Sequence, residues 1–187
     1  YVWLQSAAGV FGWLDTVLPA MVYAIYFGAV AIVLALGLAA PARRECVAVA
    51  LAIALAVLIP VVVQASSVSR TGIIWQGRYS LFLYLAVLLV AAWALSRSAR
   101  DRDGLAPRLA VVVAALVGAY SIAAFGLALH RYVVGVDGTV GEMLTAPGWQ
   151  PPLGWIPIAV LFALGTAGFA VFVSRAARDL AAEPDAD

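Results

Sequence analysis

The stretch "VAVALAIALAVLIPVVV", residues 47–63, decides the fold class, because none of its residues carries a charged or polar side chain. A helix rises ~1.5 Å per residue, so this stretch covers most of the ~30 Å hydrocarbon core of a bilayer. Backbone groups in lipid have no water to bond, which leaves helices and closed barrels as spanning structures. Pro60, near the end of the stretch, predicts a kink or an end to the helix.

Other apolar runs lie on both sides of this stretch. The chain of 187 residues is 65% hydrophobic and 11% charged, with a mean hydropathy of +1.03, whereas a soluble domain is roughly half apolar and a quarter charged. The predicted fold class is therefore an all-α integral membrane protein, a bundle of about five transmembrane helices. We place the spans at about Leu18–Ala40, Val47–Val63, Tyr79–Leu95, Leu109–Leu129 and Trp155–Val173.

The ends of the chain complete the expected organisation. We expect residues 1–17 to form an extracytoplasmic, interfacial segment, 18–173 the five-helix transmembrane domain and 174–187 a cytoplasmic tail. Pro19 suits the first turn of its helix, where a missing N–H costs nothing. The first residue is Tyr1, with no basic region and apolar signal core before it. We therefore expect a piece of a larger polytopic protein.

The arginines predict the orientation, because cytoplasmic loops carry an excess of basic residues. Three arginines (Arg70, Arg78 and Arg131) lie on one side of the predicted spans, and the other eight lie on the opposite side. The loops 64–78 and 130–154 are therefore expected to be extracytoplasmic, with the C-terminus in the cytoplasm. The absence of lysine and the heavy use of alanine indicate a GC-rich bacterial genome, and hence a bacterial plasma membrane.

Several classes of function are disfavoured by the composition. The net charge of +1 gives no general attraction for nucleic acid. Cys46 is the only cysteine and His130 the only histidine, so we expect no disulfide, metal or cofactor within this segment. None of the predicted spans carries Asp, Glu, Arg or His near its middle, which disfavours ion or proton transport.

The ligand candidates are Arg78, Arg70 and Arg131, all in the segments predicted to be extracytoplasmic. An arginine fork can hold a phosphate bidentately while its stem lies along apolar surface. A lipid-linked phosphate presents its head group at this depth. The alternative is that these arginines contact anionic lipid head groups without any specific function.

The supporting candidates lie in these two loops, in residues 1–17 or at the start of the third span: Asp15, Trp13, Trp75, Gln76, Tyr79, His130 and Glu142. Asp15 has two interpretations, an N-cap of the following helix or a carboxylate that pairs with an arginine or acts on a substrate. Glu142 is expected to open a short interfacial helix in "VGEMLTA", residues 140–146.

Two motifs resemble those of a known family. Phe11, "GWLDT" (residues 12–16) and Pro19 precede the first span, and "QGRY" (residues 76–79) opens the third. This order resembles the C-terminal part of the DUF2142 family of bacterial membrane proteins, over most of the chain. The architecture of that family is similar to the GT-C glycosyltransferases, which use polyprenyl-phosphate sugars on the outer membrane face.

The resemblance implies a donor-phosphate contact for Arg78 and a conformational or binding role for Asp15. GT-C enzymes carry their acidic catalytic residue in the first outside loop, so we expect that residue upstream of Tyr1 and assign no catalytic residue here. The implied partners are the lipid bilayer, a polyprenyl-phosphate sugar and an acceptor glycan, which the loop 130–154 would help to cover. The alternative is a non-catalytic scaffold or lipid-handling subunit of a polysaccharide assembly complex. A transporter is the third hypothesis, and it needs a polar path that these spans lack.

Overall fold

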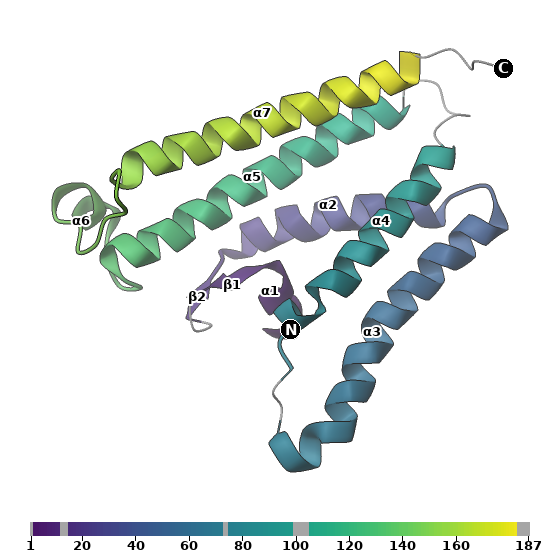
Figure 1. Ribbon diagram of the computed structural model, residues 1–187, viewed down its shortest axis with the longest axis horizontal. Helices are drawn as coiled ribbons and strands as arrows, with labels where there is room; N and C mark the ends of the chain where they lie inside the picture. Colours follow the sequence, from purple (N-terminus) through teal and green to yellow (C-terminus); the bar gives the residue numbers. More distant parts are fainter. Residues whose placement is uncertain (1, 12–14, 73–74, 99–104, 183–187) are drawn as a thin grey trace. The chain divides into compact units, whose positions relative to one another are not determined.

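The computed structural model describes residues 2–11, 15–72, 75–98 and 105–182 (Figure 1). Over these ranges the chain is helical except for one two-stranded hairpin and the connecting loops. The elements are α1 (Val2–Gly9), β1 (Val10–Phe11), β2 (Thr16–Val17), α2 (Ala20–Leu38), α3 (Arg43–Thr71), the 3₁₀ helix η1 (Gly77–Ser80), α4 (Leu81–Ser98), α5 (Leu105–Val134), α6 (Val140–Thr145) and α7 (Trp155–Ala182).

The five long helices confirm the predicted fold class. The helical segments Ala20–Leu38, Arg43–Thr71, Gly77–Arg97, Arg108–Val134 and Trp155–Asp179 are each long and apolar enough to cross a membrane. Large apolar side chains such as Phe82, Leu89 and Phe172 are exposed on these helices. Such exposure is stable when lipid is the solvent, because lipid tails are as apolar as the side chains. The chain is therefore an all-α, multi-pass membrane protein.

The helix α3 is longer than the predicted span. It passes through Pro60 without ending and continues to Thr71, so residues 64–71, expected in a loop, are helical. Polar side chains in this last part are satisfied within the helix. Ser67 donates to the Val63 carbonyl at 3.0 Å, and Thr71 donates to the Ser67 carbonyl at 3.0 Å. The hydroxyls of this polar sequence are thus satisfied by the backbone carbonyls of the helix itself.

Other boundaries also differ from the prediction. The helix α5 extends to Val134 and α7 extends to Ala182, so both are longer than the apolar runs within them. Pro19 lies just before α2, where its carbonyl accepts hydrogen bonds from the backbone N–H groups of Val22 and Tyr23. Pro19 therefore occupies the N-cap position, one residue earlier than expected.

The chain divides into two compact units, which we describe separately. The first unit comprises residues 1–8 and 27–108, and the second comprises residues 9–26 and 109–187. In the first unit α3 packs along α4, and both contact the end of α2 through a core of small residues: Ala40, Val49, Ala91 and Ala94. Gly37 of α2 lies against Ala91 of α4, so the absence of a side chain there permits close helix approach.

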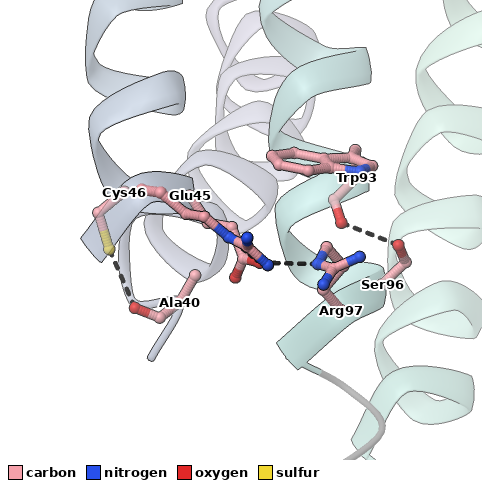
Figure 2. Close-up of polar contacts among 7 residues, drawn as sticks. Ala40, Glu45, Cys46, Trp93, Ser96 and Arg97 are labelled. Atoms are coloured by element: carbon pink, nitrogen blue, oxygen red, sulfur yellow. Dashed lines mark hydrogen bonds and ion pairs between the residues drawn. The ribbon is translucent and has the colours of Figure 1, made fainter. Parts of the chain in front are cut away.

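An ion pair joins the start of α3 to the end of α4. Arg97 Nε donates to Glu45 Oε1 at 2.8 Å, and the Glu45 side chain is only 3% exposed (Figure 2). Beside it the Cys46 thiol donates to the carbonyls of Leu38 and Ala40, at 3.1 and 2.9 Å. The thiol thereby contacts carbonyl groups at the end of α2 and just beyond it, where the last carbonyls of a helix have no partner within the helix.

In the second unit, α5 and α7 run side by side and α6 lies beyond the end of α5 (Figure 1). Phe125 of α5 stacks on Phe162 of α7 with ring centroids 4.0 Å apart. A small apolar core of Leu129, Val133 and Met143 attaches α6 to α5. The unit also contains the hairpin β1–β2, in which Val10 pairs with Val17 and Phe11 with Thr16.

Candidate functional site

The segment 75–80, here called the Arg78 turn, is held against α1 by its glycine. The Gly77 N–H donates to Ser6 Oγ at 2.8 Å, and the Ser6 hydroxyl donates to the Trp3 carbonyl at 2.9 Å. A Cβ at position 77 would overlap the Trp3 carbonyl and lie 2.6 Å from the Ala7 nitrogen. Only glycine permits this close approach, which gives "QGRY" a structural reason for its second residue.

Trp75 fixes the other side of the Arg78 turn. Its backbone N–H donates to Gln64 Oε1 of α3 at 2.8 Å. Its indole Nε1 donates at 2.9 Å to Ser80 Oγ, and Ser80 is fully buried. The turn is therefore bonded to α3 through Trp75, to α1 through Gly77 and internally between Trp75 and Ser80. These bonds fix its backbone without a ligand.

Arg78 and Tyr79 are the exposed residues of this fixed turn. The Arg78 guanidinium carbon lies 5.7 Å from the Tyr79 ring centroid, and the Tyr79 ring meets Trp75 edge-on at 6.0 Å. A cation over an aromatic ring is attracted by the ring quadrupole. Within the described part of the chain Arg78 forms no ion pair, so its N–H groups are available to an anion.

Gln76 acts through its backbone. Its carbonyl accepts from the Tyr79 N–H at 3.0 Å and so closes the first turn of η1. The side-chain Oε1 of Gln76 is buried and, among the described residues, has no hydrogen-bond partner; the same holds for Trp3 Nε1.

Arg70 lies in the last turn of α3 and is exposed. A cation is favourable there because the carbonyl end of a helix carries partial negative charge. No ion pair of Arg70 occurs within the described ranges, and no contact brings it to Arg78. The structure therefore places these two candidates in one unit without joining them.

Asp15 and Arg131 form the second cluster, in the second unit. Arg131 Nε donates to Asp15 Oδ1 at 2.8 Å, and its Nη2 donates to Oδ2. Thr16 Oγ1 also donates to Oδ1, at 3.1 Å. Asp15 lies next to β2 and does not cap a helix, so the N-cap interpretation is wrong and the pairing with an arginine is what the structure contains. Arg131 uses one edge of its fork for this carboxylate.

Electrostatics at this pair follow from the geometry. The hydrogen bond from Arg131, together with the smaller contribution of Thr16, holds the pKa of the Asp15 carboxyl below its usual value. A paired carboxylate that stays ionised is a poor general base near neutral pH, because its proton affinity is low. Asp15 therefore acts as an anchor for Arg131 and for the hairpin.

The loop after α5 folds back onto the end of that helix. The Gly148 and Trp149 N–H groups both donate to the Val133 carbonyl, at 2.8 and 3.1 Å. Trp149 also contacts the Tyr132 ring at a centroid distance of 6.3 Å. The guanidinium of Arg131 lies 5.3 Å from the same Tyr132 ring. The loop is thus connected to the Asp15–Arg131 cluster through aromatic contacts.

The short helix expected around Glu142 is confirmed, and Glu142 caps its start. The helix α6 begins after Thr139, whose hydroxyl accepts from the Glu142 N–H at 3.1 Å. In return the Glu142 carboxylate accepts from the Thr139 N–H at 2.6 Å. This reciprocal capping box lowers the pKa of Glu142. The carboxylate is committed to the helix start.

Two candidates add no geometry. Trp13, with Gly12 and Leu14 of the "GWLDT" motif, lies outside the described residues. His130, which was expected in the loop 130–154, lies in α5 and is half-buried. Within the described ranges no three His, Cys, Asp or Glu side chains gather as metal ligands.

Three residues with structural roles were not predicted from the sequence: Ser6, Gln64 and Glu45. Ser6 and Gln64 hold the Arg78 turn, but a lone serine and a lone glutamine carry no pattern that indicates long-range partners. Glu45 had a signal, because it is the one carboxylate between the arginine pair 43–44 and an apolar run. A carboxylate at the first turn of a helix suits the helix dipole, and only the packing of α4 shows that it is buried.

Comparison with known proteins gave no assignment: no protein-family model, no curated protein and no solved structure matches the chain.

Proposed function

We propose that this chain is the C-terminal membrane portion of a GT-C-like bacterial glycosyltransferase, and that Arg78 binds the phosphate of a polyprenyl-phosphate sugar. One observation carries the proposal. Arg78 presents an exposed guanidinium, without an ion pair among the described residues, on a turn whose backbone is fixed by Ser6, Gln64 and Ser80. A prepositioned cation costs no reorganisation when the anion binds.

The place of Arg78 suits a lipid phosphate. It lies in η1, immediately before the apolar helix α4, so its charge is at the end of a membrane span, where head groups lie. The end of α4 carries Arg97, bonded to the first turn of α3. The Arg78 turn thus lies at the end of α3 and the start of α4, whereas the arginine-rich segments lie at the start of α3 and the end of α4. The excess of arginines at the opposite helix ends favours an extracytoplasmic position for Arg78.

The chemistry that Arg78 supplies is charge neutralisation. When a sugar leaves its polyprenyl phosphate, negative charge grows on the phosphate oxygens. A guanidinium donates two parallel hydrogen bonds to such oxygens, and one prepositioned donor stabilises the transition state by about 3 kcal/mol. Under this proposal the catalytic carboxylate lies in the first outside loop of the full-length protein.

The second cluster has a supporting role in this proposal. The Asp15–Arg131 pair fixes the hairpin β1–β2 to the end of α5, and the folded loop 135–154 continues from there. A glycan acceptor would lie against this loop and its exposed Trp149, since aromatic rings offer an apolar face to sugar rings.

A lipid-handling subunit without catalytic activity is the alternative, and one observation favours it. Both extracytoplasmic carboxylates in contact with other side chains are used structurally, Asp15 by Arg131 and Glu142 by Thr139. Under this alternative Arg78 still binds the lipid phosphate, but no sugar is transferred.

The experiment that tests the proposal replaces the chromosomal gene with full-length variants and analyses the envelope glycans. Arg78→Gln should abolish one sugar linkage or lower it at least tenfold, because the phosphate loses its cation. Arg78→Lys should be intermediate, since lysine keeps the charge and loses the fork. Arg43→Gln, which removes an exposed arginine from the other side of the bilayer, is the control.

Protein amounts in the membrane are measured for each variant. An unchanged glycan profile in Arg78→Gln at normal protein amount contradicts the proposal. A normal profile together with lost binding of polyprenyl phosphate supports the lipid-handling alternative.

A further inference from the structure

Two arginine side chains meet at one buried carboxylate where α3 begins and α4 ends. Arg97 Nε of α4 lies 2.8 Å from Glu45 Oε1, and Arg44 Nε of α3 lies 3.8 Å from the same oxygen. Because both Nε atoms approach a single atom, the two guanidinium groups are close neighbours. We call Arg44, Glu45 and Arg97 the double-arginine cluster; Figure 2 shows Glu45 and Arg97 within it.

The double-arginine cluster carries an excess of positive charge. Glu45 is 3% exposed and offers one negative charge to two guanidinium groups, whose side chains are 71% and 46% exposed. Arg97 donates to Glu45 through Nε, so this carboxylate does not use its Nη groups. Over the described ranges no carboxylate other than Glu45 pairs with either arginine. The cluster therefore has the charge and the donors for one further anion.

The position of Arg44 is unfavourable for the helix that carries it. Arg44 lies in the first turn of α3, where the helix dipole disfavours a cation. The N-cap residue Ala42 forms no side-chain hydrogen bond to that turn. Like charge on the neighbouring Arg97 adds to the unfavourable electrostatics. A bound anion offsets both effects, because it lies close to the two guanidinium groups and to the helix start.

An apolar stripe leads from the double-arginine cluster along one face of α4. The Arg97 guanidinium carbon lies over the Trp93 ring, 5.9 Å from its centroid, and Leu89 lies one helical turn before Trp93. Residues four apart are neighbours on a helix surface, so Leu89, Trp93 and Arg97 form a continuous surface. All three side chains are exposed. A lipid with its phosphate at Arg97 can therefore lay a chain on this stripe.

We propose that an anionic phospholipid binds where α3 begins and α4 ends, with its phosphate on Arg44 and Arg97 and an acyl chain along Trp93 and Leu89. Charge complementarity selects this occupant, because basic surface beside the membrane attracts anionic head groups. The distribution of arginines predicts that these helix ends are cytoplasmic. The Arg78 turn lies at the opposite ends of α3 and α4, so the lipid site does not rest on the proposed function.

Native mass spectrometry of the full-length protein in detergent tests the phosphate contact. The probes are dioleoyl-phosphatidylglycerol and dioleoyl-phosphatidylcholine, and the affinity for the first bound lipid is compared. The wild type should prefer the phosphatidylglycerol. Arg44→Gln should weaken its binding about fivefold and narrow the preference. Arg175→Gln removes the same charge from an exposed position in the second unit and should bind both lipids as the wild type does.

Melting temperatures in lipid-free detergent establish that Arg44→Gln and Arg175→Gln are folded. Arg44→Gln keeps the hydrogen bond between Glu45 and Arg97, so its fold is retained while the second guanidinium is lost. Unchanged affinity for phosphatidylglycerol in Arg44→Gln would overturn the proposal. Equal affinity of the wild type for the two lipids, or an equal loss in Arg175→Gln, would overturn it as well.

The placement of the acyl chain is tested on α4. Trp93→Ala removes the aromatic surface and its contact with the Arg97 guanidinium, so phosphatidylglycerol should bind about two- to fivefold more weakly. Phe82→Ala is the matched control, because Phe82 is an exposed aromatic residue at the other end of the same helix. It should bind as the wild type does. Equal affinities of the two alanine variants would overturn the placement along Trp93.

Glycerol 3-phosphate distinguishes a lipid from a free phosphate. It carries the anionic group without chains, so millimolar amounts should not displace the phosphatidylglycerol. Displacement would show a site for free phosphate and would overturn the proposal. A photo-crosslinker at position 89 in native membranes should label lipid, and labelling of protein alone would show that a protein partner covers the stripe instead.

Discussion

Asp15 and Arg131 are joined by a two-point ion pair that connects residues 116 positions apart in the chain. The pair fixes the hairpin β1–β2 to the last turn of α5. It also distinguishes Arg131 from the other arginines that the sequence suggests as phosphate ligands. Arg131 is committed to a carboxylate, whereas Arg78 has only the Tyr79 ring beside it in the described part of the chain.

The Asp15–Arg131 pair predicts a pH dependence of stability. Arg131 lowers the pKa of Asp15 in the folded state, so its contribution is present above the unfolded value of about 3.8 and is lost as the pH falls further. Asp15→Asn should therefore melt at a lower temperature than the wild type at pH 7, and the difference should shrink below about pH 4.

Thermal unfolding in detergent from pH 7 to pH 2.5 checks this prediction. Asp137→Asn is the control, because Asp137 is exposed and makes no ion pair within the described residues. A difference between Asp15→Asn and the wild type that is constant down to pH 2.5 would show that the pair does not depend on the ionised carboxylate.

Gly77→Ala should destabilise the first unit. The new methyl group would overlap the Trp3 carbonyl and crowd Ala7, and overpacking of this kind costs about 1–3 kcal/mol of the free energy of unfolding. Gly28→Ala is the matched control, since a Cβ at Gly28 meets nothing within 4 Å. The control should be neutral or more stable by up to about 1 kcal/mol. Equal melting temperatures for the two variants would contradict the close contact of α1 with the Arg78 turn.

Arg97→Gln should destabilise the contact of α3 with α4. It leaves the carboxylate of Glu45, which is 3% exposed, without its hydrogen-bonded cation. Loss of a partner from a buried ion pair costs several kcal/mol, but Arg97 is itself 46% exposed, so we expect about 1–3 kcal/mol after solvent screening. Arg44→Gln is the control, because Arg44 is 71% exposed and lies 3.8 Å from Glu45.

Chemical unfolding of both variants provides the comparison. A loss in Arg44→Gln as large as that in Arg97→Gln would show that the surface charge, and not the buried pair, is what stabilises this end.

Thr139→Ala should loosen α6. It removes the hydroxyl that accepts from the Glu142 N–H, and the loss of such a cap costs about 1 kcal/mol. Hydrogen exchange of the amides 140–145 should become severalfold faster, while the amides of α7 remain unchanged. Thr145→Ala is the control, because the Thr145 hydroxyl bonds only the Gly141 carbonyl within the helix. Equal exchange in both variants would contradict the capping box.

The long helices could be predicted because the bilayer leaves few alternatives. A run such as residues 47–63 has one way to satisfy its backbone in lipid. The ends of the helices are less determined, because Ser67 and Thr71 can bond either water or the helix backbone, and the structure has them on the helix. Pro60 did not end α3 either, because a membrane helix can adjust its local backbone geometry around a proline.

The candidate site was predictable only in part. The position of Arg78 at the end of a span followed from the sequence, and so did the helix that Glu142 opens. The partners of these residues did not follow, because pairs such as Ser6 with Gly77 depend on how helices pack. Asp15 had two open interpretations, and only the fold of the second unit decides that Arg131 is its partner.

Binding of a short-chain polyprenyl phosphate to the purified full-length protein tests the central claim most directly. The dissociation constant is measured by calorimetry for the wild type, Arg78→Gln and the control Arg43→Gln, with the corresponding polyprenol as the uncharged ligand. Charge-assisted hydrogen bonds contribute about 1.5–3 kcal/mol, so Arg78→Gln should bind the phosphate about 10- to 150-fold more weakly and bind the polyprenol as the wild type does. Equal affinity of the wild type and Arg78→Gln for the phosphate would contradict the assignment of Arg78 as its ligand.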